Sequence, residues 1–136
     1  MNMAHASSSA SGKRWMVWLG WAFTAIPALM MLFSASMKLT HNPQFAQTFN
    51  SVFGWPESTL TPLGIVELAC VAVYLIPQTA VLGAIVLTGY LGGATAAHVR
   101  IGDASAWIAV AVGVVAWGGL FLRDSRLRQL IPMRRG

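Results

Sequence analysis

Four long apolar runs limit what this chain can fold into more than any other feature. They span roughly residues 15–37, 59–76, 78–98 and 105–122, and none contains more than one or two ionisable residues. A helix needs about 20 apolar residues to cross a hydrocarbon core of about 30 Å. The alternation of a β-barrel strand is absent from the sequence. We therefore expect an all-α integral membrane protein with four transmembrane helices.

The composition supports this fold class. Of the 136 residues, 56% are hydrophobic and only 10% are charged, whereas soluble domains carry about 25% charged residues. The net charge of +5 comes from basic residues gathered at the two chain ends, which is typical of a membrane topology signal and does not predict nucleic-acid binding. Cys70 is the only cysteine, so a multi-cysteine metal site and an intramolecular disulfide are excluded.

The connections predict an up-down-up-down bundle in a single domain, 15–122. The second and third runs meet at Pro77-Gln78, and the third and fourth at the short turn 100–103, so consecutive spans must be antiparallel. The remaining segments are a small polar tail, 1–14, which we expect to be disordered, and a basic tail, 123–136.

The segment between the first two spans is mixed in character. Asn42-Pro43 is a favourable helix start, because asparagine caps the first amides and proline fits the first helical position. An apolar face follows, formed by Phe45, Phe49, Val52 and Phe53. The pattern predicts a short amphipathic helix that either lies in the membrane interface or packs over the end of the bundle.

The basic residues predict the orientation. The first run is longer than the 7–15 residues or so of a signal-peptide core, so we expect it to be retained as a helix. With the N-terminus inside, seven basic residues are cytoplasmic and two, Lys38 and Arg100, lie outside. The seven are Lys13, Arg14, Arg123, Arg126, Arg128, Arg134 and Arg135. The positive-inside rule then predicts a multi-pass protein of the bacterial inner membrane with both termini cytoplasmic.

Nearly all other ionisable residues fall at the outer ends of the predicted spans. They are Lys38, His41, Glu57, Glu67, His98, Arg100 and Asp103. Glu67 is five residues after Pro62, about 7–8 Å into its helix. An isolated carboxylate at that depth in lipid costs roughly 2–4 kcal/mol. Glu67 must therefore face the interior with a partner, or carry a proton.

Three candidate catalytic residues can converge from three helices. Lys38 ends the first helix, and its stem can reach back toward Glu67, while His98 ends the third helix on the same side. Tyr90 lies two turns below His98 as a candidate ligand contact, and Arg100 can join this group or bind lipid headgroups. The structural alternatives stay open: the Lys–Glu pair can simply lock two helices together, and His98 can cap its helix.

The third span carries a small-residue stripe, Gly89-x-x-x-Gly93, extended by Ala97. Such a stripe lets helices pack closely inside the bundle or at a dimer face, and it can also form a slot for a flat ligand. We therefore count Gly89 and Gly93 as candidate ligand contacts. No metal-ligand spacing is present, and we expect no metal site.

The chain resembles the DoxX-like family of small bacterial membrane proteins over about residues 15–122. The resemblance rests on Lys38, the step Phe53-Gly54-Trp55-Pro56, Gly64 with Glu67, the Ile76-Pro77 turn, Gly89-Tyr90-Leu91-Gly92-Gly93, and His98-Val99-Arg100-Ile101-Gly102-Asp103. A threonine often precedes the histidine in such sequences, where this chain has Ala97. The resemblance implies a four-helix membrane bundle. The family takes its name from a subunit linked to quinone-dependent respiratory oxidation.

Three functional hypotheses follow. The first is a redox-associated protein that binds a quinone or a similar lipophilic small molecule around Glu67, together with a redox partner protein. The second is an acid–base enzyme, an isomerase or hydrolase, acting on a lipophilic substrate. The third is a structural subunit, or a small-solute transporter that acts as a homo-oligomer.

Overall fold

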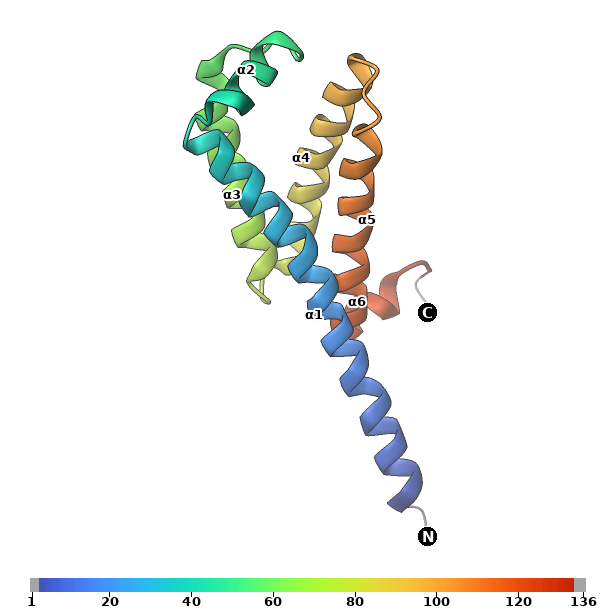
Figure 1. The fold of residues 1–136 in the computed structure, drawn as a ribbon. Coiled ribbons are helices and arrows are strands. Elements are labelled where there is room, and N and C mark those ends of the chain that lie inside the picture. Colours follow the sequence, from blue (N-terminus) through green and yellow to red (C-terminus); the bar gives the residue numbers. More distant parts are fainter. Residues whose placement is uncertain (1–2, 134–136) are drawn as a thin grey trace.

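The chain folds into four long helices and two short ones. The structure, a computed structural model, describes the backbone of residues 3–133 and the side chains of residues 12–133. Within this part the long helices are α1 (Met3–Leu39), α3 (Leu60–Leu75), α4 (Ala80–Arg100) and α5 (Ala106–Arg123), and the short ones are α2 (Pro43–Ser51) and α6 (Ser125–Leu130). A 3-10 turn, Glu57–Thr59, precedes α3, and these residues include no strand. The predicted all-α four-helix bundle is confirmed (Figure 1).

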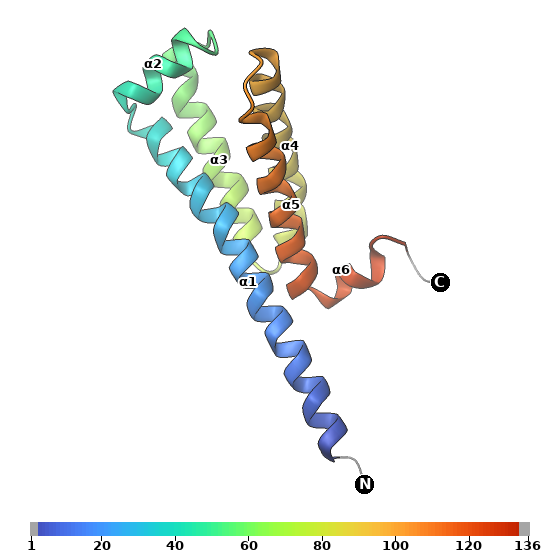
Figure 2. The same cartoon turned by 45° about the vertical axis from the view of Figure 1, so that its right-hand side comes forward.

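The four long helices form a ring. α1 packs against α3 and α5, and α4 packs against the same two helices, so α1 and α4 lie diagonally opposite each other. The chain runs up, down, up and down, with α2 at one end of the bundle and α6 near the other (Figure 2). We call these the α2 end and the α6 end. The first turns of α1 project beyond the bundle on the α6 side (Figure 1).

The short helix predicted between the first two spans is present as α2. The Asn42 side chain accepts hydrogen bonds from the amides of Gln44 and Phe45, and Pro43 occupies the first turn. The rings of Phe45, Phe49 and Phe53 follow one another with centroids 5.8 and 5.7 Å apart. α2 lies over the ends of α1 and α3 (Figures 1 and 2).

Glycines bring the helices together at the α6 end. A Cβ added at Gly119 would lie 2.8 Å from the backbone nitrogen of Thr24, and one at Gly20 would lie 2.8 Å from that of Arg123. Tyr74 is fully buried here and donates a 2.7 Å hydrogen bond to the carbonyl of Ala116. From this close contact, α1 and α3 diverge from α4 and α5 toward the α2 end (Figures 1 and 2).

The structure differs from the sequence prediction in the N-terminal tail, and it adds a short helix to the basic tail, for which the sequence predicted no secondary structure. Residues 3–14, expected to be disordered, continue α1 as a helix. The segment holds no proline, and alanine is the strongest helix former. In the basic tail, Asp124 caps α6 by accepting from the amide of Arg126, and Arg128 donates to the last carbonyls of α5. Residues 1–2 and 134–136 lie outside the described residues.

The outer surface of the bundle is apolar. Large hydrophobic side chains such as Trp18, Trp107 and Val114 are 74%, 75% and 66% exposed. In water such a surface would be unfavourable by about 25 cal/mol for each square ångström. The structure has four helices long and apolar enough to cross a membrane, at Gly12–Leu39, Glu57–Leu75, Ala80–Arg100 and Ala106–Arg123. The chain is a multi-pass membrane protein.

Gly119→Ala should destabilise the bundle, because its methyl group would meet backbone atoms of α1 that cannot move aside. We expect a loss of about 1–3 kcal/mol in the free energy of unfolding, measured by denaturation in detergent. The control is the neighbouring Gly118→Ala, whose methyl group would meet only Phe23 at an ordinary 3.7 Å. Equal stability of the two variants would contradict the close α1–α5 packing.

Candidate functional site

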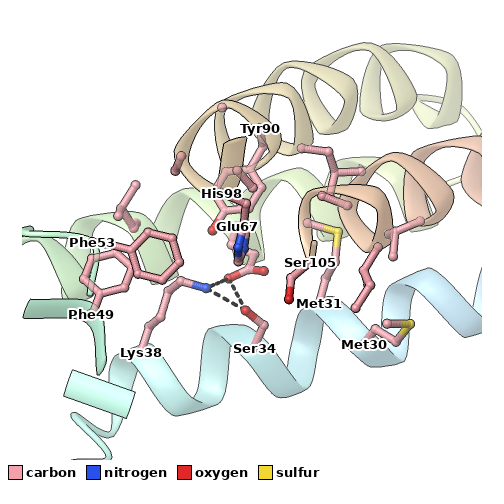
Figure 3. Close-up of a pocket in the computed structure, with 18 of the residues that line it drawn as sticks. Met30, Met31, Ser34, Lys38, Phe49, Phe53, Glu67, Tyr90, His98 and Ser105 are labelled. Atoms are coloured by element: carbon pink, nitrogen blue, oxygen red, sulfur yellow. Dashed lines mark hydrogen bonds and ion pairs between the residues drawn. The ribbon is translucent and has the colours of Figure 1, made fainter. Parts of the chain in front are cut away.

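A cavity of about 500 Å³ occupies the space where the helices diverge. Most of its wall is apolar, and the aromatic residues of α2 and the following loop cover the α2 end. Its polar side chains come from α1 (Ser34 and Lys38), α3 (Glu67), α4 (Tyr90 and His98) and the start of α5 (Ser105). The aromatic residues are Phe45, Phe49, Phe53 and Trp55. Figure 3 shows the site.

A buried ion pair forms one wall of the cavity. Lys38 Nζ lies 2.8 Å from Glu67 Oε2 and also donates a 2.6 Å hydrogen bond to Ser34 Oγ (Figure 3). The Ser34 hydroxyl donates in turn to Glu67 Oε2 at 3.4 Å. Only 7% of Lys38 and 3% of Glu67 are exposed. Each charge therefore depends on the other for its stability in the apolar interior.

Gly64 makes this pair possible. A Cβ at Gly64 would lie 2.9 Å from Leu39 Cγ and 3.2 Å from Lys38 Cβ, so the end of α1 lies directly against α3 at this position. Glu67 is one turn further along α3 and faces the same side as Gly64. The close approach of the helices thus brings the lysine at the end of α1 to the carboxylate.

A second pair lies on the opposite helices. His98 Nδ1 is 2.9 Å from Asp103 Oδ2, and the Asp103 side chain also accepts from the amide of Ser105. These two interactions, with the Ser105 amide the stronger, lower the pKa of Asp103 below its usual value. Gly102, with φ of 71°, makes the turn that returns Asp103 to the histidine. The edge of the His98 ring meets Phe53 with centroids 5.0 Å apart.

The structure brings most of the candidate residues together. Lys38 and Glu67 are in contact, and His98, Tyr90, Gly89 and Gly93 line the same cavity. Apart from their chain neighbours and the nearby backbone of α4, no described atom lies within 4 Å of a Cβ built at Gly89 or Gly93. These two glycines therefore do not bring α4 close to another helix of the same chain. They widen the cavity.

Three ionisable residues from the outer ends of the spans, Arg100, His41 and Glu57, lie away from the cavity. Arg100 is outside the cavity lining, and its guanidinium donates to the carbonyl of Phe53, which ties the loop after α2 to the end of α4. His41 pairs with Glu57 at 3.1 Å and with the hydroxyl of Thr61 at 2.8 Å on the exposed surface.

Sequence analysis missed the two residues that orient the charged groups. Ser34 lies one helical turn before Lys38, a spacing that places both on one face of α1. Asp103 follows His98 by five residues across a glycine turn, and its position in the sequence indicated only that it lies among the ionisable residues at the outer ends of the spans. In the part of the chain that the structure describes, no three His, Cys, Asp or Glu residues gather closely enough to hold a metal ion.

The fold and the site define a class of protein: a four-helix multi-pass membrane protein with a cavity that contains a buried carboxylate. The sequence matches the model of the DoxX-like family over residues 22–119, more than half of its length, and the chain belongs to this family. Neither the curated proteins nor the solved structures include a match to it.

Lys38→Met should destabilise the protein strongly, because it leaves the Glu67 carboxylate buried without its cation. We expect a loss of about 3 kcal/mol, measured by thermal unfolding in detergent. The double variant Lys38→Met with Glu67→Gln should recover more than half of this loss, since no buried charge remains. A single variant as stable as the wild type would contradict the importance of the ion pair.

Proposed function

We propose that this protein binds a lipophilic small molecule with a polar head, a quinone being the leading candidate, and that its function is redox-associated. The single observation that carries the proposal is Glu67: a carboxylate 3% exposed that lines a cavity of about 500 Å³. A quinone needs hydrogen-bonding groups for its ring and an apolar path for its tail, and the cavity offers both kinds of wall. A redox partner protein would supply or take up the electrons.

The route into the cavity favours a ligand from the bilayer. Met30 of α1 and Ile108 of α5 line the cavity, yet 46% and 55% of their surfaces are exposed on the lipid-facing side of the bundle. From the α2 end the aromatic residues cover the cavity, and the contact between Arg100 and Phe53 holds the covering loop in place. A lipophilic molecule would enter between α1 and α5.

The distribution of basic residues supports a location for the site. Arg123, Arg126 and Arg128 lie at the α6 end, together with Lys13 and Arg14 in α1. The positive-inside rule then makes the α6 end cytoplasmic, with both termini inside. In the inner membrane of a bacterium, the cavity would open in the outer half of the bilayer.

An acid–base enzyme is the second candidate. The observation that favours it is the contact between His98 and Asp103, because a carboxylate that orients a histidine toward a cavity is a common arrangement in general acid–base catalysis. Glu67, from the opposite side of the cavity, would be the second proton-handling group. An isomerase needs two such groups, one to remove a proton and one to return it elsewhere.

Transport by a single chain receives less support. The half of the bundle at the α6 end is closed by contacts between the backbones of α1 and α5 and by buried Tyr74. A pore would therefore have to form between subunits of an oligomer. A structural subunit role predicts that the Glu67→Gln substitution alters stability or assembly only.

The binding proposal is tested with a short-tailed benzoquinone added to the purified protein in detergent. Trp55 lines the cavity, so binding should quench tryptophan fluorescence in a saturable manner. The corresponding quinol, added without oxygen, can donate to the Glu67 carboxylate, whereas a quinone cannot. We therefore expect Glu67→Gln to weaken binding of the quinol about tenfold or more, as loss of a charged hydrogen-bond acceptor costs about 1.5–3 kcal/mol. The matched control is Glu57→Gln, a carboxylate 61% exposed and outside this cavity.

Gly93→Leu provides a second test that does not touch the charges. The site is open around Gly93, so leucine should fill part of the cavity without straining the fold. We expect the variant to unfold at the wild-type temperature or above, and to lose quinone binding. Unchanged quenching in both Gly93→Leu and Glu67→Gln would place the quinone elsewhere and refute the proposal.

A further inference from the structure

We propose that the cavity selects ligands that donate hydrogen bonds, so that it binds a quinol, the reduced form with two hydroxyl groups, more tightly than the corresponding quinone. This inference rests on the proposed function and names the form of the ligand that the site recognises. The polar groups around the cavity fall into two sets. One set already makes hydrogen bonds within the protein, and the other remains available to a ligand.

The lysine and serine donors of the cavity wall are engaged within the protein. The Lys38 ammonium group donates to Glu67 Oε2 and to Ser34 Oγ, and it lies over the ring of Phe45 at 5.3 Å from the centroid. A lysine has three N–H groups; two of them make these hydrogen bonds, and the ammonium group also faces the aromatic ring. The Ser34 hydroxyl is directed at Glu67 Oε2. Both side chains are therefore held by partners within the protein before a ligand arrives.

The Glu67 carboxylate keeps a free acceptor. Its hydrogen bonds to Lys38 and Ser34 both reach Oε2, and the Tyr90 hydroxyl also lies close enough to the carboxylate to interact with it. A carboxylate has about four acceptor sites on its two oxygens. With the residue 3% exposed and lining the cavity, a hydroxyl group of a ligand is the natural donor for Oε1.

His98 supplies a second acceptor. Its Nδ1 faces the Asp103 carboxylate, which accepts only. A neutral His98 therefore carries its proton on Nδ1, and Nε2 is left with a lone pair. Because Asp103 stays ionised through its contacts with the Ser105 amide and His98, this tautomer is fixed. The second carboxylate thus sets the hydrogen-bonding character of the histidine.

The other polar groups do not reverse this preference. The hydroxyls of Tyr90 and Ser105 can either donate or accept. The indole N–H of Trp55 is a fixed donor, but Trp55 is 39% exposed and belongs to the covering loop. The two strongest unengaged groups, Glu67 Oε1 and His98 Nε2, both accept. A quinone, whose oxygens only accept, would face them without a proton to share.

The experiment compares three probes of similar shape by calorimetry, without oxygen and at about pH 8. The probes are a short-tailed benzoquinone, its quinol, and the dimethyl ether of that quinol, which cannot donate. We expect the quinol to bind at least tenfold more tightly than either of the others. A tenfold preference would raise the midpoint potential of the bound two-electron couple by about 30 mV.

Asp103→Asn is the decisive variant. The asparagine amide can donate to His98 Nδ1, which moves the ring proton to Nε2 and turns this acceptor into a donor. We expect the quinol preference to fall about tenfold, chiefly because the quinone binds more tightly. His98→Phe should lower the preference without this gain for the quinone. Glu57→Gln is the control and should keep the wild-type preference, and thermal unfolding of each variant confirms that it is folded.

The outcomes separate the two proposals. Equal binding of quinol and quinone, or tighter binding of the quinone, would overturn the inference and leave the quinone site standing. An unchanged preference in Asp103→Asn would also overturn it, because the fixed tautomer would then play no part. If none of the three probes binds, the proposed function fails, and the inference fails with it.

Discussion

The contact between Lys38 and Glu67 is the interaction on which the site depends. Two opposite charges lie within an apolar bundle, and each is tolerated only because the other is 2.8 Å away. The pair requires the end of α1 to lie directly against α3, which the missing side chain of Gly64 allows. Once the pair forms, Lys38 and the Oε2 atom of Glu67 are engaged with each other in the wall of the cavity. The same pairing that lets these charges lie in the membrane interior would also position the carboxylate for the proposed ligand.

The same four helices have opposite packing at their two ends. At the α6 end Gly20 and Gly119 allow backbone contact, and buried Tyr74 completes the closure. At the α2 end Gly89 and Gly93 face open space, and aromatic side chains of α2 cover it. Glycine therefore has two uses here, bringing helices together and leaving room between them. A rigid closed end is what allows a stable cavity to persist at the other.

Much of the fold could be predicted, because hydrophobic length and helix caps are local signals. Asn42 and Pro43 begin α2 as expected, and the tight turns fix the antiparallel order. The depth of Glu67 required a partner, and the structure provides Lys38. Asp103 was missed, since its role depends on a turn at Gly102 that returns it to His98. The helical conformation of residues 3–14 was also missed, because a short polar tract gives no periodic signal.

By itself the sequence determined that this is a membrane protein with four spans. It also determined that the segment between the first two spans has an apolar helical face, and that the interior charges lie at one end of the spans. The reason is that every segment in lipid must separately meet the same requirements. It must be long enough to cross the bilayer, its backbone groups must be hydrogen-bonded, and any charge it carries must be paired. Only the tertiary structure decided which glycines pack and which open a cavity, and which hydrogen-bonding atoms remain free. Those properties belong to pairs of helices, and the spacing of residues along one helix does not reveal what the facing helix places opposite them.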